Sequence, residues 1–257
     1  MPIPALNQSE ESARKRICFA LDAPTAYKAI ELALELGPYV GLFKIGKELH
    51  TAAAYAGARI IQQIHDYSPD GSSNIFLDLK FHDTPNTVYQ ASRAATVPGV
   101  GMFNVHIAGG ERMCKEALNG AYEAAFSQKI EHPRVIGVTV LTSLNDVDLV
   151  AEGLGISCND LVRRRTELAK QWSLDGVVCP ASQAGALEKE FGSDFLYVTP
   201  GIEWAGVSRE GQKQLYTPDK AVQDCKNSIL VIGGAIAKAS DKPATAYAIL
   251  QAMAPYV

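Results

Sequence analysis

The sequence has no long apolar run and no excess of charge of one sign. No apolar stretch reaches the roughly 20 residues that a membrane-spanning helix needs, and the opening segment MPIPALNQSEESARKR lacks the apolar core of a signal peptide. The formal net charge is −4, and the basic residues are scattered, which argues against a surface for nucleic acid or for an anionic membrane. We therefore expect a cytoplasmic protein that binds neither.

Paired cysteines and metal-ligand spacings are also missing. The five cysteines, Cys18, Cys114, Cys158, Cys179 and Cys225, are an odd number and widely spaced. None belongs to a CxxC pair or lies near a histidine cluster of zinc-ligand spacing. We expect reduced, mostly buried thiols and no metal site.

No linker divides the chain. A length of 257 residues with 47% hydrophobic residues can form one large core or two small ones. Because there is no Pro/Ser-rich linker, low-complexity segment or break in composition, we interpret residues 1–257 as one domain. Residues 1–16 form a polar N-terminal extension in this interpretation.

Short apolar runs of strand length alternate with longer amphipathic segments such as 24–37, 109–127, 158–173 and 181–190. This alternation is typical of βα units around a parallel sheet. Eight strands in this length fit an α/β protein of the (β/α)8 TIM barrel type better than an open doubly wound sheet. The predicted strands are 17–22, 40–46, 75–80, 101–107, 135–141, 175–180, 195–201 and 229–234.

The third predicted strand ends in a cluster of charges, in the segment NIFLDLKFHDTPNT. The C-terminal ends of barrel strands carry the active site, and alternation along a strand places Asp78 and Lys80 on the same side. Burying two charges costs several kcal/mol per ion, which favours a functional pair over a merely neutralising one. Asp83 or Thr84 could instead cap a helix that begins at Pro85.

The first two predicted strands also end in charge. FALD places Asp22 at the end of the first strand, and LFKIG places Lys44 near the end of the second. Either residue alone could be a cap or a surface group. Together with Asp78, Lys80 and Asp83 they form an alternating array, whose attractions can keep each lysine protonated and each carboxylate ionised.

At these residues the sequence resembles the orotidine 5′-monophosphate decarboxylase family, over nearly the whole chain. DLKFHDTPNT carries the resemblance, with FALD, FKIG, TVLTS and VTPGI in the same order. The 3-keto-gulonate-phosphate decarboxylases and hexulose-phosphate synthases share the DxKxxD spacing but bind magnesium and have an acidic residue in place of Lys44. The resemblance therefore implies a lyase without metal or cofactor, which converts orotidine 5′-monophosphate to uridine 5′-monophosphate in pyrimidine biosynthesis.

The resemblance also implies a role for each charged residue. Lys80 would donate a proton to C6 of the pyrimidine, Asp78 would face the departing carboxylate, and Lys44 would bridge the array. The family forms homodimers with shared sites, so Asp83 and Thr87 would reach the site of the neighbouring subunit. The position of Asp83 beyond its strand agrees with this, because the residue could hardly point back into its own barrel.

Further substrate contacts are implied from other strands. Asp22 would bind ribose hydroxyls, and Thr142 in TVLTS would contact the pyrimidine edge, although Thr142 could equally cap a helix. Gln212 would contact the phosphate from segment 201–218, which has the composition of a lid. The substrate-binding residues on this interpretation are Asp22, Thr87, Thr142, Pro200, Gln212, Gly233 and Gly234.

The phosphate site is expected at the ends of the seventh and eighth strands, where barrels use backbone N–H groups and a helix N-terminus. Family members usually continue the eighth strand as Gly-Arg, and bacterial members often have another arginine after PGI. This chain has Gly234 and Glu203 at those places. Arg209 or Lys213 could take the place of the arginine. Alternatively, the backbone alone could bind the phosphate with lower affinity, or the arginine could have been removed by engineering.

Two other functions remain open from the sequence. A magnesium-dependent sugar-phosphate decarboxylase or aldolase of the same superfamily would lose its activity in chelator. A non-catalytic barrel that binds a phosphorylated ligand is the other. The complete array disfavours it, since a mere binder has no need to hold Asp78 against a substrate carboxylate.

Overall fold

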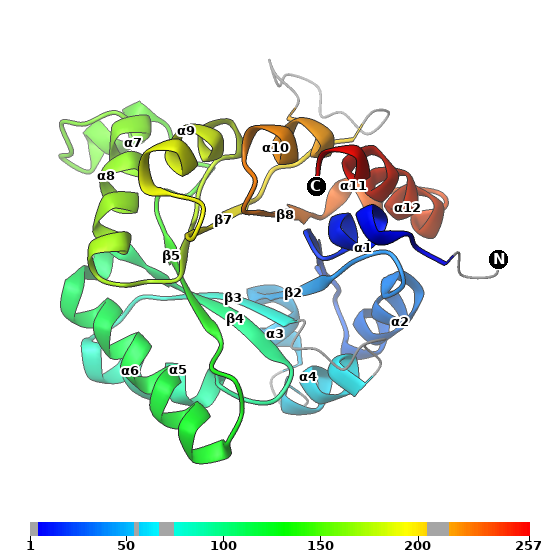
Figure 1. Cartoon of the computed structure of the whole chain (residues 1–257). Helices are drawn as coiled ribbons and strands as arrows, with labels where there is room; N and C mark the ends of the chain where they lie inside the picture. The colour runs from blue at the N-terminus through cyan, green and yellow to red at the C-terminus, as the bar shows by residue number, and fades with distance from the viewer. Residues whose placement is uncertain (1–4, 54–56, 67–74, 205–215) are drawn as a thin grey trace.

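Eight parallel strands close into a barrel in sequence order, which confirms the predicted (β/α)8 fold (Figure 1). The structure is a computed structural model that describes residues 5–53, 57–66, 75–204 and 216–257. The helices lie outside the ring of strands. The strands are β1 (Ile17–Ala20), β2 (Leu42–Gly46), β3 (Ile75–Phe81), β4 (Val100–His106), β5 (Arg134–Val138), β6 (Gly176–Val178), β7 (Leu196–Thr199) and β8 (Ser228–Ile232).

The helices follow the strands in alternation, with α1 (Gln8–Arg14) preceding β1 inside the segment predicted as a polar extension. A capping box at Asn7 and Glu10 begins α1. The other α-helices are α2 (Ala26–Leu36), α3 (Lys47–Ala52), α4 (Gly57–Asp66), α5 (Pro85–Ala95), α6 (Gly110–Gln128), α7 (Asp146–Ala151), α8 (Cys158–Gln171), α9 (Ala181–Phe191), α10 (Pro218–Asp224), α11 (Gly234–Ala237) and α12 (Lys242–Met253). Short 3-10 helices cover Ile107–Gly109 and Ala254–Tyr256.

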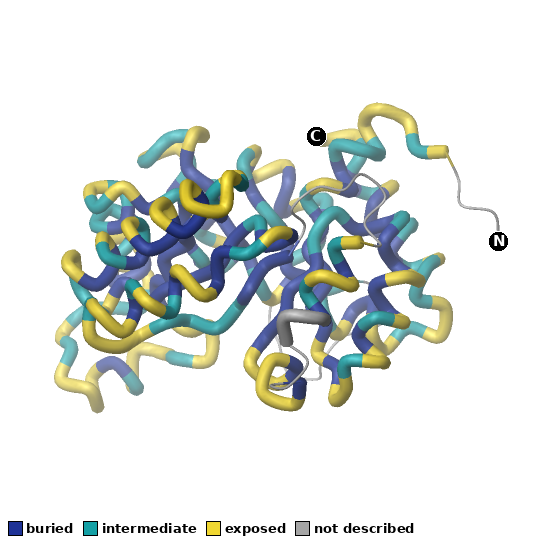
Figure 2. The backbone as a smooth tube through the Cα atoms, turned by 90° about the horizontal axis from the view of Figure 1, so that it is seen from below, coloured by how far each residue is buried: buried dark blue, intermediate teal, exposed yellow. Residues whose placement is uncertain are grey.

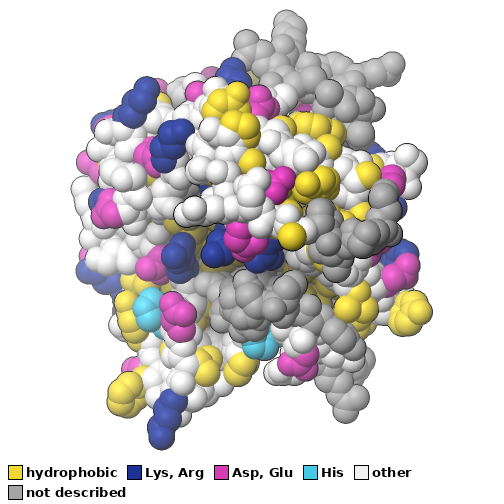
Figure 3. Space-filling model, turned by 45° about the vertical axis from the view of Figure 1, so that its right-hand side comes forward, with side chains coloured by type: hydrophobic (Ala, Val, Ile, Leu, Met, Phe, Trp, Pro, Cys, Tyr) yellow, Lys and Arg dark blue, Asp and Glu magenta, His cyan; other side chains and the backbone are white. Residues whose placement is uncertain are grey.

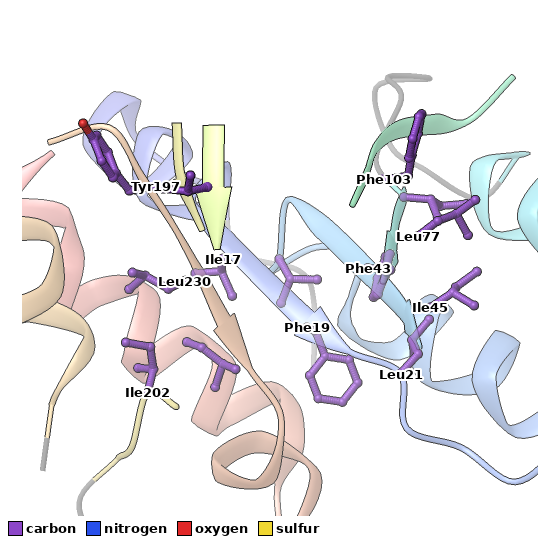
Figure 4. Packing of buried hydrophobic residues seen from close by; sticks show 14 of the residues in the cluster. Ile17, Phe19, Leu21, Phe43, Ile45, Leu77, Phe103, Tyr197, Ile202 and Leu230 are labelled. Atoms are coloured by element: carbon purple, nitrogen blue, oxygen red, sulfur yellow. The ribbon is translucent and has the colours of Figure 1, made fainter. Parts of the chain in front are cut away.

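Alternation along the strands produces two apolar layers. Inside the barrel lie Cys18, Ala20, Phe76, Met102, Ile136, Leu196, Val198 and Val231. The intervening strand residues pack against the helices, as Figure 4 shows for Phe19 of β1 and Phe43 of β2. Burial is therefore greatest along the strands and least on the outer helix surfaces (Figure 2).

The surface carries no strong single-sign field on the face shown in Figure 3, where basic and acidic side chains are interspersed. Among the described residues, no helix is long and apolar enough to cross a membrane. All five cysteines are free, and four of them are buried. Burial raises the pKa of the Cys18 thiol to about 12, which makes it a poor nucleophile.

Candidate active site

Strand β3 is irregular where its charged residues lie. Between the pairs Leu77–Phe103 and Phe81–Val105, β3 advances four positions, from 77 to 81, while β4 advances two, from 103 to 105. Lys80, inside this irregularity, has a φ of 54°, in the left-handed region that residues other than glycine rarely adopt. The backbone at Lys80 therefore departs from a regular ladder at the barrel mouth.

The structure brings Asp22, Lys44, Asp78 and Lys80 together in one chain of alternating charge. Lys80 Nζ donates to Asp78 Oδ1 at 2.5 Å, and Lys44 Nζ lies 3.5 Å from Asp78 Oδ2. Lys44 Nζ also donates to Asp22 Oδ1 at 3.3 Å. Lys44 and Asp78 are largely buried, whereas the Asp22 side chain is 58% exposed. The array thus runs from the solvent-facing Asp22 into the barrel mouth.

Gly46 provides the space for the Lys44 ammonium. A Cβ at position 46 would lie 3.0 Å from Lys44 Nζ and 3.6 Å from Asp22 Oδ1. Positions 44 and 46 face the same side of β2, so any side chain at 46 would compete with the lysine for that side. Sequence reasoning missed Gly46, although a glycine two positions after an inward lysine is a readable signal.

Asn104 of β4 is fully buried and hydrogen-bonded to both residues of the Asp78–Lys80 pair. Its Nδ2 donates to Asp78 Oδ1 at 2.7 Å, and its Oδ1 accepts from the Lys80 backbone N–H at 2.7 Å. Sequence reasoning missed this residue as well. The signal was an amide inside the otherwise apolar strand GMFNVHI.

The lysines keep Asp78 ionised despite its burial. Burial alone would raise the pKa of Asp78, but the hydrogen bond and charge of Lys80, the charge of Lys44 and the hydrogen bond from Asn104 outweigh it. The pKa of Asp78 therefore lies below its usual value. His106, at the end of β4, has its pKa lowered to about 4 by burial and by nearby positive groups, so it is neutral at pH 7.

Two adjoining cavities open at the strand ends beside the array. The first, of about 130 Å³, is walled largely by apolar side chains and has Lys44, Asp78 and Lys80 at its edge. The second, of about 480 Å³, lies at the ends of β7 and β8 and is more polar. Both are lined by Thr142 and Val231, so they can hold two parts of one ligand.

The second cavity contains two charged residues of opposite sign. The Cε of Lys238, just after α11, lies 3.9 Å from the place that a Cβ on Gly234 would occupy, so its stem runs beside bare backbone. Glu203 Oε2 is buried there and has no hydrogen-bond partner within the described part of the chain. Sequence reasoning had not considered Lys238.

A third cavity, of about 380 Å³, lies at the opposite end of the barrel. Residues at the first positions of three strands, Leu42, Val100 and Arg134, are among those that line it. In TIM barrels the active site lies at the C-terminal ends of the strands, whereas the N-terminal ends serve stability. We therefore place the candidate site in the first two cavities.

Four of the predicted substrate-binding residues line the two cavities. Thr142 lines both cavities, Pro200 lines the first, and Gly233 and Gly234 line the second. The alternative of Thr142 as a helix cap is wrong, because Asn145 caps the next helix, α7. Gln212, Arg209 and Lys213 lie outside the described residues.

Asp83 and Thr87 are exposed and are not hydrogen-bonded to the array among the described residues. Asp83 Oδ1 accepts from the Thr84 backbone N–H at 2.6 Å. Thr84 occupies the N-cap position of α5, which begins at Pro85 as predicted, but its side chain makes no capping bond. Its Oγ1 lies 3.0 Å from Thr87 Oγ1 instead.

The residues of the array do not suit a divalent cation. The Lys44 ammonium lies between the carboxylates of Asp22 and Asp78, where a metal would need both oxygens for itself. Within residues 5–53, 57–66, 75–204 and 216–257, no three His, Cys, Asp or Glu side chains form a metal-holding group. The donor set thus disfavours the magnesium-dependent alternative.

Fold and site together define a barrel enzyme that sets an ammonium against a carboxylate beside an apolar pocket. Residues 15–249 match the model of the orotidine 5′-phosphate decarboxylase / HUMPS family. The chain belongs to this family, as an enzyme of the carboxy-lyase class, and the resemblance found in the sequence is confirmed.

Similar proteins cover nearly the full length. The orotidine 5′-phosphate decarboxylase of Sodalis glossinidius is 41% identical over 247 residues, 96% of this chain and 93% of that protein. That of Marinomonas sp. is 40% identical over 230 residues, 90% of this chain and 93% of that protein. The crystal structure of the enzyme from Lactobacillus acidophilus superposes with a TM-score of 0.76 at 31% identity, covering 92% of this chain and 98% of that chain.

Proposed function

We propose that this enzyme decarboxylates orotidine 5′-monophosphate to uridine 5′-monophosphate in pyrimidine biosynthesis, without metal or cofactor. The observation that carries the proposal is the Asp22–Lys44–Asp78–Lys80 array at the edge of the apolar cavity. The names of the relatives support the same substrate. Five free cysteines suit a reducing compartment, so we place the reaction in the cytoplasm.

The reaction needs strong electrostatic help, because loss of CO2 from C6 leaves a vinyl carbanion that the pyrimidine ring cannot delocalise. An ionised Asp78 within about 4 Å of the substrate carboxylate would repel it by roughly 4 kcal/mol at an effective dielectric near 20. The largest enzymatic accelerations need about 20 kcal/mol or more. The positive charge of Lys80 opposite the developing carbanion must therefore supply much of the effect.

Lys80 then acts as the proton donor to C6. Its ammonium is oriented by Asp78, which is itself fixed between Lys80, Lys44 and Asn104. Such preorganisation avoids the reorganisation that water would need around a forming carbanion. Binding energy from the remote phosphate contributes the remainder by forcing the substrate carboxylate against Asp78.

The two cavities suit the two ends of this nucleotide. The small apolar cavity takes the pyrimidine, with Thr142 at its edge and Pro200 in its wall. Asp22, exposed beside Lys44, binds ribose hydroxyls. The larger cavity at the ends of β7 and β8 takes the phosphate, on the backbone of Gly233 and Gly234.

Chelation tests the proposed reaction against its nearest alternative. The decrease in orotidine 5′-monophosphate absorbance should proceed at the same rate in excess EDTA, because no step uses a metal. A sugar-phosphate decarboxylase that needs magnesium would lose its turnover in EDTA and would not consume the nucleotide. Binding of the nucleotide without any turnover would indicate the non-catalytic barrel instead.

Lys238 is our candidate for the phosphate-binding cation in place of an arginine at 234. A charge-assisted hydrogen bond is worth roughly 1.5–3 kcal/mol, so Lys238→Met should raise KM by about tenfold or more. Glu203→Gln should lower KM, since removing a nearby negative charge relieves a repulsion on the order of 1 kcal/mol, or about fivefold. Both changes should vanish with orotidine, which lacks the phosphate. Lys115→Met, on the exposed surface of α6, is the matched control.

Gly234→Arg separates Lys238 from the other candidate cations. In the Lys238→Met background the new guanidinium should restore KM, because it can form two hydrogen bonds to the phosphate. In the parent it should add little, since the Lys238 stem already lies beside position 234. A severe loss in Arg209→Ala or Lys213→Ala, with Lys238→Met unchanged, would assign the cation to segment 201–218.

The active site is completed by a second subunit in this proposal. Asp83 and Thr87 lie beyond the end of β3 and are exposed, so they are free to contact another molecule. The exposed side chains of Val147 and Val150 on α7 add apolar surface that a second copy can cover. We therefore propose a homodimer in which Asp83 and Thr87 cross the interface.

A further inference from the structure

We propose that Asn104 is a positioning residue that sets the geometry of the Asp78–Lys80 pair. The inference rests on the proposed function and extends it to a residue beneath the substrate cavity. Its amide bonds the side chain of one member and the backbone of the other. One rigid group therefore fixes the carboxylate and the lysine with respect to each other.

The backbone at Lys80 needs this partner. The register shift between β3 and β4 spans this residue, and its N–H is bonded to the Asn104 side chain. An N–H shielded from water without a partner destabilises the fold. The left-handed φ of 54° at Lys80 adds strain that persists only where surrounding contacts determine it. Asn104 supplies such a contact from inside the barrel.

The carboxylate of Asp78 needs it equally. Asp78 Oδ1 accepts from both Lys80 Nζ, at 2.5 Å, and Asn104 Nδ2, at 2.7 Å, while Oδ2 faces Lys44 at 3.5 Å. Among the described residues, the groups that would still hold the Asp78 carboxylate without the amide are two flexible lysines. The amide comes from a strand and is fully buried, so it limits rotation of the Asp78 side chain.

Asn104 acts through its neighbours and not on the substrate. Its exposed surface is 0%, and it is absent from the walls of both cavities. Its loss should therefore lower kcat and leave KM unchanged, which is the signature of a disturbed transition state with intact binding.

Other titratable groups lie close to the Asp78–Lys80 pair. They are Asp22 and Cys18 of the β1 region, Lys44 of β2 and His106 of β4.

Asn104→Ala is the first test. We expect kcat to fall by about 100-fold, the scale of a catalytic group misplaced by about 1 Å, with KM within about threefold of the parent. Ser228→Ala is the matched control, since it also removes a buried polar group from a strand but at the opposite end of the barrel. It should lose stability without losing kcat.

Asn104→Asp is the second test and keeps the shape of the side chain. Its carboxylate can still accept from the Lys80 N–H, but an oxygen replaces the donor to Asp78. A proton shared between the two carboxylates restores that bond, so the ratio of variant to parent kcat should rise about tenfold per pH unit as pH falls from about 8 to 6. A merely structural role would leave this ratio constant.

The outcomes separate the inference from the proposed function. No turnover of orotidine 5′-monophosphate by the parent would overturn both. Turnover by the parent with an unchanged kcat in folded Asn104→Ala, or a flat ratio in Asn104→Asp, would overturn the role of Asn104 alone. If the alanine variant does not fold, the aspartate variant decides, because it fills the same volume.

Discussion

Lys80→Ala is expected to abolish decarboxylation, with kcat lower by at least about 10⁴-fold. General acid catalysis alone contributes about 10²–10⁴-fold, and the variant also loses the charge opposite the carbanion. Asp78 would keep Lys44 and Asn104 as partners but lose the ammonium of Lys80, so the substrate carboxylate would meet repulsion without compensation at C6. The measurement is single-turnover consumption of orotidine 5′-monophosphate at saturating concentration.

The fold should survive this change. The Lys80 side chain lies at the barrel mouth and is 25% exposed, and the packed layers on either side of the strands do not include it. The circular dichroism spectrum and the melting temperature should therefore stay close to those of the parent. The control variant Lys115→Ala should keep both the parental stability and the parental activity. Activity within tenfold of the parent in a folded Lys80→Ala variant would remove Lys80 from the role of acid.

The fold could be predicted because its pattern is local. Each strand is a short apolar run between longer amphipathic segments, so eight runs predicted eight strands. Their ends were less well placed. The predicted fifth strand extended to residue 141, but β5 ends at Val138. Val140 continues the apolar run because it lines the cavity, although it is not part of the strand.

The face of a helix was also misplaced where the apolar pattern was wide. In α2 we expect a core-facing set of Ile30, Ala33 and Leu34 from the sequence, yet Leu34 is 49% exposed. The buried side chains are Ala29, Leu32, Ala33 and Leu36, which follow the helical repeat from Ala29. Gly37 and Pro38 predict the end of this helix, and α2 does end at Leu36.

The four charged residues of the array could be found from sequence because each lies at or near the C-terminal end of a predicted strand. Asn104, Gly46 and Lys238 were missed. The sequence offers a signal for Asn104 and Gly46, but the role of all three depends on contacts between elements. Asn104 meets β3 only because β3 carries two extra residues, which no local pattern predicts. Lys238 lines the second cavity from the C-terminal end of α11, a position that depends on how this short helix packs after β8. The site residues that the sequence did not predict are thus those whose positions depend on the register between strands and on packing between distant segments.

Mixing two inactive variants is expected to restore activity if the site is shared. Lys80→Ala and Asp83→Ala should each be inactive alone, because each lacks one residue in every site. In a mixed dimer one site receives an intact Lys80 from one subunit and an intact Asp83 from the other. With random pairing half of the dimers are mixed, and half of their sites are complete, giving about a quarter of the parental activity.

The control distinguishes sharing from simple stabilisation. Lys80→Ala mixed with Asp78→Ala should recover nothing, because both residues belong to the same subunit's array and every site would lack one of them. Exchange of subunits is verified with two tags of different size. Exchange without recovery in the Lys80→Ala and Asp83→Ala mixture would mean that Asp83 acts within its own chain. Since Asp83 now bonds only its neighbouring backbone among the described contacts, that result would require the segment after β3 to fold back toward the array.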